Sequence, residues 1–301
     1  MDVFLGVDAG GTRTRCVLGD GMRVIGNGVG DGANVVRVGP DRARASIHAA
    51  IQRACGDASV STAEIVRTCI GAAGISSPGV VDLLRRFVSE VVSGDVRVLG
   101  DHDIAFEAAL GAEPGVLVIA GTGSVAFGRN AQGSQARAGG YGFAISDEGS
   151  GQWIGRAAVS QILRALDRGT HTTLHRSVLD AWNIEADALV KSANTSPPPN
   201  FSALCPIVVT AAIEGDSVAT VILQRAGGEL AQLAVVVLDR LWAMHEAVDV
   251  ATVGGVFQHS SIVRRHFALA LRRLHPLARI QESVVDPVMG ALSLARKPVA
   301  I

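Results

Sequence analysis

A carboxylate and two glycines stand close together near the start of the chain, in the segment VFLGVDAGGTRT. Residues 3–7 form a short apolar run that predicts a buried strand, and Asp8 lies at its end. The turn that follows contains Gly10, Gly11, Thr12, Arg13 and Thr14. Glycines let the backbone approach a bulky anion, and successive N–H groups in such a turn can bind phosphate oxygens. A neighbouring carboxylate can hold Mg²⁺. Taken alone, the segment is equally compatible with a plain hairpin.

A second glycine turn occurs in the middle of the chain, within GVLVIAGTGSVAFG at residues 115–128. An apolar strand, a turn and another apolar strand follow one another as they do in the first hairpin, and this turn contains Gly121, Thr122, Gly123 and Ser124. Such a weak internal duplication predicts two related domains, one in each half of the chain. A third glycine pair, Gly254 and Gly255, follows the apolar run 248–253.

The elements that must position these turns alternate between strands and helices, which indicates the α/β class. Strands are predicted at 24–29, 67–74, 96–99 and 248–253, and helices from Pro40, from Pro78 and over 104–110, 152–166, 206–226, 229–245, 262–274 and 286–295. Residues 192–200, SANTSPPPN, predict an exposed loop. Ligands of open α/β sheets bind at the carboxyl ends of strands, where the three turns fall. Neither a P-loop nor a Rossmann fingerprint occurs.

Composition excludes several classes of protein. The chain has 301 residues, of which 48% are hydrophobic, so two domains with sizeable cores are expected. Lys plus Arg (27) nearly balance Asp plus Glu (28), which predicts neither a nucleic-acid nor a membrane partner. The four cysteines are scattered without a CxxC pair, and the N-terminus lacks a basic region. We therefore expect a reduced, cytoplasmic protein.

Four segments in this order resemble a known family: DAGGTRT, AGTGS, GGYGFAISDEGSGQWIG at 139–155, and VGGVF at 253–257. They resemble the N-acetylglucosamine kinase branch of the sugar kinase, Hsc70 and actin superfamily, with its BadF/BadG-type ATPase domain. The glycine-aromatic-glycine run followed by DEGS is the most specific part. The resemblance implies two ribonuclease-H-like domains around a cleft for ATP and sugar, with expected limits 1–113, completed by 286–301, and 114–285.

The resemblance also assigns roles to individual residues. Asp8 matches the metal-associated aspartate. The phosphate-binding residues would be Gly10, Gly11, Thr12, Arg13, Thr14, Gly121, Thr122, Gly123 and Ser124, and Gly254 and Gly255 would contact the adenosine. The sugar would be contacted by Asn34, Asp103, Gly140, Tyr141, Gly142 and Asp147. Asp147 and Glu148 also admit a structural interpretation, as carboxylates at the N-terminus of a helix.

Asp103 matches the family's catalytic aspartate, which usually follows Asn, whereas His102 precedes it here. Asp101 is the alternative. Asp103 is preferred because its spacing to the AGTGS turn then requires a single-residue gap. A carboxylate at this position would accept the proton of the attacking sugar hydroxyl.

The resemblance implies an ATP- and Mg²⁺-dependent kinase for an amino sugar, with N-acetylglucosamine 6-phosphate as the product and glucosamine as the alternative substrate. A homodimer is among the arrangements it allows. An ATPase activator of a radical dehydratase shares this domain, but the cysteines follow no cluster-ligand spacing. A sugar-sensing regulator would need a DNA-binding domain, and this chain begins directly at its first strand.

Overall fold

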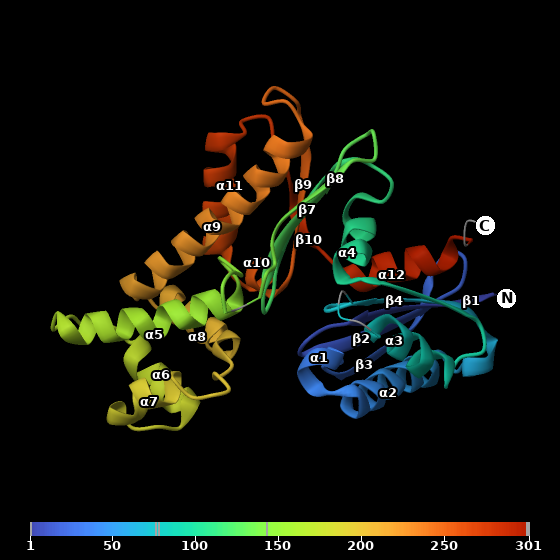
Figure 1. Cartoon of the computed structure of the whole chain (residues 1–301), viewed down its shortest axis with the longest axis horizontal. Helices are drawn as coiled ribbons and strands as arrows, with labels where there is room; N and C mark the ends of the chain where they lie inside the picture. Colours follow the sequence, from blue (N-terminus) through green and yellow to red (C-terminus); the bar gives the residue numbers. More distant parts are fainter. Residues whose placement is uncertain (1, 76, 78, 143, 299–301) are drawn as a thin grey trace. The chain divides into compact units, whose positions relative to one another are not determined.

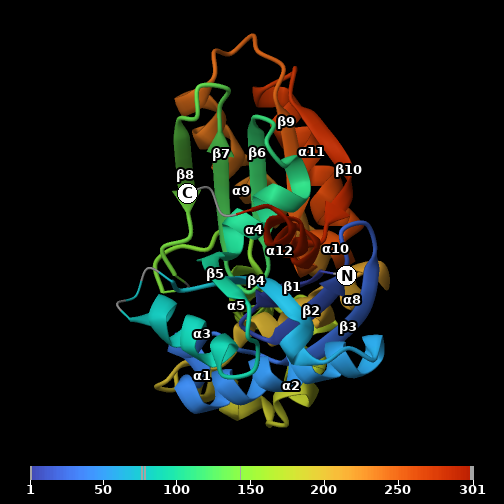
Figure 2. The ribbon, with the colours of Figure 1, turned by 90° about the vertical axis from the view of Figure 1, so that its right-hand side faces the viewer.

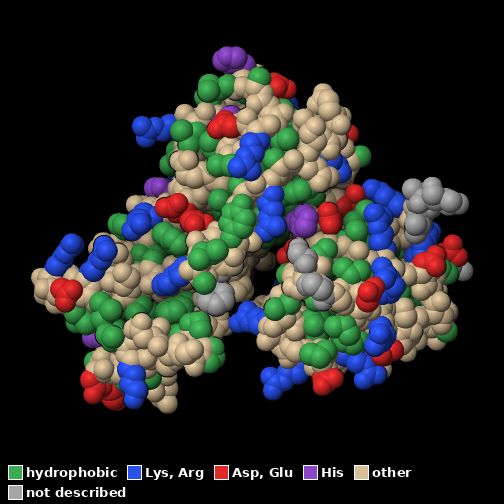
Figure 3. All heavy atoms as spheres, viewed as in Figure 1, with side chains coloured by type: hydrophobic (Ala, Val, Ile, Leu, Met, Phe, Trp, Pro, Cys, Tyr) green, Lys and Arg blue, Asp and Glu red, His purple; other side chains and the backbone are tan. Residues whose placement is uncertain are grey.

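The computed structural model describes residues 2–75, 77, 79–142 and 144–298 (Figure 1). It divides the chain into two compact units. Unit 1 contains Met1–Glu113 and Val285–Ile301, and unit 2 contains Pro114–Val284. On the face drawn in Figure 3, cationic and anionic side chains are interspersed, in keeping with the balanced charge of the sequence.

Unit 1 is built on a five-stranded sheet of order β3-β2-β1-β4-β5. The strands are β1 (Val3–Ala9), β2 (Arg13–Gly19), β3 (Val24–Asp31), β4 (Ile65–Ala72) and β5 (Asp95–Gly100). Strands β1, β2 and β3 pair antiparallel, whereas β4 pairs in parallel with β1 and with β5. Strand β1 is therefore central, and its last residues bring Asp8 to the carboxyl end of the sheet.

Helices cover both faces of this sheet (Figures 1 and 2). The helices of unit 1 are α1 (Val35–Val38), α2 (Pro40–Ala58), α3 (Val80–Ser89), α4 (Asp101–Leu110) and α12 (Pro287–Arg296), with a 3₁₀ turn at Thr62–Glu64. Leu5 and Val7 pack with α2 and α3, and Phe4 packs on the other side with α4 and α12. This alternation along β1 is the period of two expected of a strand between two helical layers.

The chain's last helix packs directly on its first strand. A Cβ on Gly6 of β1 would lie 2.4 Å from the backbone nitrogen of Leu292 in α12, so glycine permits this close approach. Arg296 of α12 also donates to the carbonyl of Asp20 at 2.7 Å. The C-terminal helix is therefore an integral part of unit 1.

Unit 2 repeats the same strand arrangement in the order β10-β9-β6-β7-β8. The strands are β6 (Gly115–Ala120), β7 (Ser124–Arg129), β8 (Gln135–Gly139), β9 (Asp249–Val253) and β10 (Arg279–Val285). Central β6 pairs antiparallel with β7 and in parallel with β9, as β1 does with β2 and β4. The duplication seen in the sequence is thus a duplication of sheet topology.

The helices of unit 2 are α5 (Gly151–Asp167), α6 (Leu174–Trp182), α7 (Leu189–Ala193), α8 (Cys205–Ile213), α9 (Ser217–Leu241), α10 (Gly255–His259) and α11 (Ser261–Leu274), with 3₁₀ turns at Ala186–Ala188 and Phe201–Leu204. Helix α9 is long and apolar enough to cross a membrane by length and composition. However, Leu230, Ala234 and Leu238 of this helix belong to the same buried cluster as Val116 and Val118 of β6. Helix α9 is accordingly a core helix of unit 2.

The sequence predicts one helix at 206–226 and another at 229–245, whereas the structure has α8 at Cys205–Ile213 and α9 at Ser217–Leu241. The expected boundary between helices near residues 226–229 is absent, because Gly227 and Gly228 lie inside α9. Gly227 is needed there for packing, since a Cβ would lie 2.7 Å from the carbonyl of Val263 in α11. The chain instead breaks at Gly215, with a φ of 97°, and Asp216 caps α9 by accepting from the N–H of Ala219 at 2.9 Å.

Other differences concern the ends of elements. Strand β1 continues to Ala9, so Asp8 lies inside the strand, and α4 begins at Asp101 instead of near residue 104. Strands β8 and β10 had not been predicted. Pro78, the expected start of a helix, lies outside the described residues, and α3 begins at Val80.

Candidate active site

The first glycine turn joins β1 to β2 and is closed by a hydrogen bond from the N–H of Gly10 to the carbonyl of Arg13 at 3.0 Å. In the part of the chain that the structure describes, the N–H groups of Gly11 and Thr12 have no acceptor. Two successive free donors at the carboxyl end of a strand form a concave site for an anion. The geometry therefore agrees with the phosphate-binding role predicted for this turn.

Thr14, another predicted phosphate contact, is fully buried below the turn. Its hydroxyl donates to the carbonyl of Asp31 at 2.7 Å and lies 3.2 Å from the hydroxyl of Ser46. These contacts tie the base of the turn to β3 and α2. The Thr14 side chain thus supports the turn, whereas Thr12 and Arg13 are exposed on it.

The second turn, between β6 and β7, has the same construction. The N–H of Gly121 donates to the carbonyl of Gly123 at 2.9 Å, and among the described residues the N–H groups of Thr122 and Gly123 have no acceptor. The carbonyl of Gly121 accepts from the N–H of Gly151, at the start of α5, at 2.8 Å. Each unit therefore carries one turn with a pair of free N–H groups.

Ser124, at the end of the second turn, is bound on two sides by the DEGS segment. Its N–H donates to Oδ1 of Asp147 at 3.3 Å, and its hydroxyl donates to the carbonyl of Glu148 at 2.7 Å. Ser124 and Asp147 are only 3% and 7% exposed. The Asp147 carboxylate also leaves no room for a side chain at Gly123, where a Cβ would lie 2.9 Å from Oδ2.

The helix-capping interpretation of Asp147 is wrong. Helix α5 is capped by Ser150, whose hydroxyl accepts from the N–H of Trp153 at 3.2 Å. Asp147 has a φ of 67°, a left-handed conformation that is uncommon in residues other than glycine, although Asn, Asp and His adopt it more often than most. Burial raises the pKa of its carboxyl group, and the hydrogen bond from Ser124 opposes that rise. Its carboxylate therefore binds the turn at residues 121–124 and does not cap the helix.

The GGYG segment at 139–142 begins with Gly139, the buried last residue of β8, and continues into a turn that is exposed at Tyr141 and Gly142. Gly140 and Gly142 have φ values of 73° and 97°, and the carbonyl of Gly140 accepts from Arg137 at 2.6 Å. Tyr141 is 70% exposed. An exposed ring beside polar backbone can pack on the face of a sugar, which is compatible with the role predicted for these residues.

The third glycine pair lies against the second turn. Gly254 has a φ of 105°, and a Cβ there would lie 2.3 Å from the carbonyl of Ala120 and 3.1 Å from the nitrogen of Gly121. Gly255, the first residue of α10, is exposed. Unit 2 therefore brings together the predicted phosphate turn and the predicted adenosine turn.

Asn34 is joined to the first turn through its own loop. The N–H of Ala33 donates to the carbonyl of Gly10 at 3.0 Å. Asn34 caps the short helix α1, because its Oδ1 accepts from the N–H of Arg37 at 3.2 Å. The predicted sugar contact is thus joined to the first glycine turn by backbone hydrogen bonds within unit 1.

Asp101 and Asp103 lie in the first turn of α4, where β5 ends. Oδ2 of Asp103 accepts from the N–H of Gly100 at 2.9 Å, so one of its oxygens caps the helix. Oδ1 of Asp101 accepts from the N–H of His102 at 2.9 Å. The imidazole of His102 lies 3.6 Å from Oδ1 of Asp101 and 3.7 Å from Oδ1 of Asp103.

The charge around Asp8 links it to Asp101. Burial raises the pKa of Asp8 to about 6, and the negative charge of Asp101 is the next contribution in size. Asp286 raises this pKa too, whereas Arg15 and Arg13 lower it. A buried carboxylate of this kind favours a nearby cation.

The sequence did not single out Arg15 or Asp286. Arg15 faces Asp8 across the β1–β2 pairing, and its Nη1 lies 2.5 Å from Oδ1 of Asp286, the residue before α12. The register of the predicted hairpin could have placed Arg15 beside Asp8, because the turn length sets that register. No local pattern points to Asp286, which is 271 residues away along the chain.

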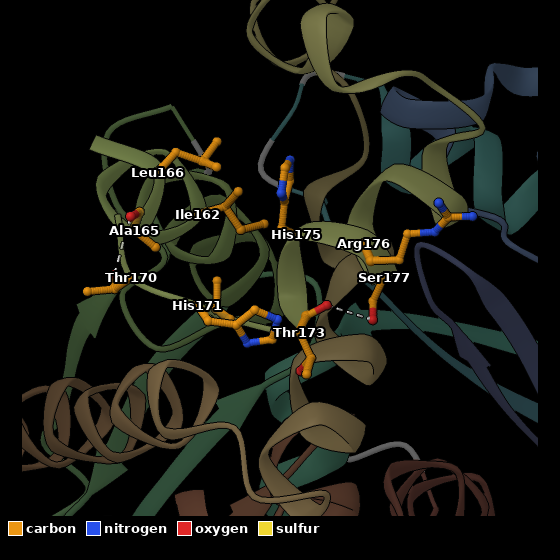
Figure 4. Close-up of a pocket in the computed structure, with 10 residues that line it drawn as sticks. Ile162, Ala165, Leu166, Thr170, His171, Thr173, His175, Arg176 and Ser177 are labelled. Atoms are coloured by element: carbon orange, nitrogen blue, oxygen red, sulfur yellow. Dashed lines mark hydrogen bonds between the residues drawn. The ribbon is translucent and has the colours of Figure 1, made fainter. Parts of the chain in front are cut away.

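A cavity of about 460 Å³ lies elsewhere in unit 2, between the end of α5 and the start of α6 (Figure 4). Its lining includes Ile162, Leu166, His171, Thr173 and Arg176. None of the predicted site residues lines it, so it does not belong to the candidate active site.

The geometry defines a class of protein: a duplicated α/β protein in which each unit holds one glycine turn with two N–H groups that have no acceptor among the described residues. The sequence pattern of the BadF/BadG/BcrA/BcrD ATPase family matches residues 5–295. The chain belongs to this family.

Named relatives cover nearly the whole chain. The N-acetylmuramic acid/N-acetylglucosamine kinase of Clostridium acetobutylicum is 28% identical, over 98% of this chain and 99% of its own. The N-acetyl-D-glucosamine kinase of Dictyostelium discoideum is 26% identical, over 98% of each chain. A crystal structure from Chromobacterium violaceum, provisionally assigned as an N-acetylglucosamine kinase, superposes with a TM-score of 0.79 at 26% identity, over 98% of this chain and 99% of that one.

Proposed function

We propose that this protein is an ATP-dependent amino sugar kinase that converts N-acetylglucosamine to its 6-phosphate. The observation that carries the proposal is the pair of glycine turns, each with two successive N–H groups that have no acceptor among the described residues. The full-length similarity to kinases of N-acetylglucosamine supports the choice of substrate. Glucosamine is the alternative substrate.

In this proposal the protein mainly positions the reactants and neutralises charge, which is what phosphoryl transfer requires. The N–H groups of the two turns bind the phosphates of ATP, and Gly254 and Gly255 lie along the adenosine. Asn34 and the GGYG turn with Tyr141 contact the sugar. Two hydrogen bonds, from Ser124 to Asp147 and from Ala33 to Gly10, would hold the sugar-contacting segment of each unit against the phosphate turn of the same unit.

Asp8 is the residue that would hold Mg²⁺. Its buried carboxylate, with a pKa raised to about 6, is stabilised in the ionised form by a nearby cation. Magnesium is commonly held by one or two carboxylates together with substrate phosphates, so a site with few protein ligands suits it. When bound, the ion would neutralise charge on the phosphate oxygens.

We propose Asp101 as the general base, although the sequence favoured Asp103. Each carboxylate has one oxygen bound to a backbone N–H at 2.9 Å, Asp103 to Gly100 and Asp101 to His102, so these hydrogen bonds do not distinguish them. Among the charged groups around Asp8, Asp101 has the largest effect on the pKa of Asp8, which supports a position of Asp101 near the proposed metal. In this role Asp101 accepts the proton of the sugar hydroxyl as that oxygen attacks the terminal phosphate.

The alternative function, an ATPase activator of a radical dehydratase, requires cysteines that can bind an iron–sulfur cluster. Cys16, Cys55, Cys69 and Cys205 are all buried, and burial raises the pKa of each thiol. Cluster ligands are thiolates, so these cysteines support the kinase instead. A cytoplasmic location fits the same reduced thiols, and we propose it with a homodimer as the assembly to test.

An ADP-release assay over a small set of sugars tests the proposal. We expect turnover with N-acetylglucosamine that exceeds the rate without sugar, and weaker turnover with glucose. The rates with glucosamine and with N-acetylmuramic acid measure how strongly the substituents at carbon 2 and at carbon 3 affect turnover. ATP hydrolysis at one rate, whatever sugar is present, would contradict the kinase and favour the activator.

A further inference from the structure

Arg37 lies over the first glycine turn and has no role in the predictions from sequence. It is the third residue of α1 and is exposed. A Cβ placed on Gly11 would lie 3.5 Å from Nη1 of Arg37. The guanidinium therefore lies beside the backbone of this turn, at ordinary van der Waals distance from the position that a Gly11 Cβ would take.

The backbone holds Arg37 in this place. Gly32 packs so closely on the turn that a Cβ there would lie 2.4 Å from the carbonyl of Gly11. The N–H of Ala33 donates to the carbonyl of Gly10 at 3.0 Å, and the N–H of Arg37 itself donates to Asn34 at 3.2 Å. These contacts hold the start of α1 against the turn, so the backbone of Arg37 is positioned beside the turn and its side chain can extend toward a ligand there.

The guanidinium of Arg37 has no hydrogen-bond or ion-pair partner within the described ranges. Other arginines of unit 1 differ: Arg15 is paired with Asp286, and Arg44 is paired with Glu90. A planar, permanently charged group beside two free N–H donors offers a complementary site to an oxyanion with several oxygens.

We propose that Arg37 binds an oxyanion that is held at the first glycine turn, in addition to the backbone donors of Gly11 and Thr12. This inference rests on the proposed function. The oxyanion has two sources: the terminal phosphate of ATP, or a carboxylate carried by an amino sugar bound at Asn34. Both offer the oxygen geometry that a guanidinium recognises.

The test compares Arg37→Ala and Arg37→Lys with the wild-type chain and with Arg42→Ala, a matched loss of one exposed arginine from the neighbouring helix α2. Binding of ADP and of the non-hydrolysable analogue AMPPNP is measured by calorimetry. Initial rates are measured with N-acetylglucosamine and with N-acetylmuramic acid, which carries a carboxylate.

If Arg37 binds the terminal phosphate, Arg37→Ala weakens the binding of AMPPNP by about tenfold or more and leaves the binding of ADP nearly unchanged. It also lowers kcat/KM for both sugars. If Arg37 binds the sugar carboxylate, only kcat/KM for N-acetylmuramic acid falls by about that factor. Arg37→Lys recovers part of the loss in either case. Changes no greater than those of Arg42→Ala in all four measurements would overturn the inference. A wild-type protein that turns over neither sugar would contradict the proposed function, while the AMPPNP comparison would still decide whether Arg37 binds phosphate.

Discussion

The backbone N–H of Ser124 donates to the buried carboxylate of Asp147 at 3.3 Å, across 23 residues of sequence. The contact joins the second glycine turn, at residues 121–124, to the segment that follows Gly142. The Ser124 hydroxyl adds a second tie, to the carbonyl of Glu148 at 2.7 Å. The AGTGS turn and the DEGS segment are therefore joined by two hydrogen bonds.

Asp147→Asn should separate this structural role from charge recognition of the sugar. Asparagine keeps an acceptor for Ser124 and tolerates the φ of 67°. We expect the KM for ATP to stay within about twofold of wild type, whereas Asp147→Ala, which loses the acceptor, raises it by about tenfold. Steady-state kinetics with ATP as the varied substrate measure both. An equal rise in both variants would show that the hydrogen bond to Ser124 is not what matters.

Gly123→Ala should destabilise unit 2 through a clash with Asp147, because the new Cβ would lie 2.9 Å from its carboxylate. We expect a loss of about 1–3 kcal/mol in the free energy of unfolding, as for other overpacked sites. Asp147→Gly in the same chain should restore part of that loss, since glycine accepts the left-handed φ and removes the carboxylate.

Gly121→Ala is the matched control for Gly123→Ala, because no atom lies within 4 Å of its Cβ position. Thermal unfolding without ligands should leave Gly121→Ala near wild type. Similar losses in the two single variants would refute the clash.

Asp101→Asn should abolish turnover and leave nucleotide binding intact, if Asp101 is the general base. Asp103→Asn should keep most activity, because the asparagine side chain can still accept from the N–H of Gly100, the cap that Asp103 makes at 2.9 Å. General base catalysis contributes roughly 10²- to 10⁴-fold in rate, so the two variants should differ clearly in kcat. The reverse pattern would return the role to Asp103, as the sequence favoured.

The stability of the unliganded protein should fall as pH rises through about 6, because of Asp8. Its folded-state pKa is raised from 3.8 to about 6. Between pH 3.8 and about pH 6, the folded protein therefore binds more protons than the unfolded chain, and its stability falls as the pH rises. Ionisation of the buried carboxyl group is therefore a cost above pH 6. Asp8→Asn removes this cost, so we expect its unfolding temperature to exceed that of wild type at pH 7.5.

The advantage of Asp8→Asn should shrink toward pH 4, where Asp8 is protonated in the folded state. Mg²⁺ with ATP should stabilise the wild-type protein more at pH 7.5 than at pH 5, because the ionised carboxylate is the form that binds a cation. A difference between the variants that does not change with pH would contradict the raised pKa.

Much of the architecture could be predicted from sequence because its signals are local. The apolar runs around Asp8 and Gly121 define the two central hairpins, and their common order predicts the duplication that the sheets show. The helix break at residues 226–229 was wrong because Gly227 serves packing against α11. A propensity for helix ends cannot reveal a contact with a helix more than 30 residues away.

The candidate site was predictable in its residue types more than in its contacts. The glycine turns could be found because free N–H groups need small residues at strand ends. The burial of Thr14 and the hydrogen bond from Ser124 to Asp147 depend on tertiary packing, so the sequence predicted ligand contacts for both residues, and helix capping for Asp147, but neither of these structural roles. The pairing of Arg15 with Asp286 joins opposite ends of the chain and has no local pattern at all.

Identification of the product by phosphorus NMR is the most direct test of the central proposal. The purified protein is incubated with ATP, Mg²⁺ and N-acetylglucosamine, and the spectrum is compared with that of authentic N-acetylglucosamine 6-phosphate. We predict a sugar-phosphate resonance that matches the standard and grows in step with ADP. Release of inorganic phosphate in step with ADP, with no sugar phosphate formed from N-acetylglucosamine or glucosamine, would contradict an amino sugar kinase.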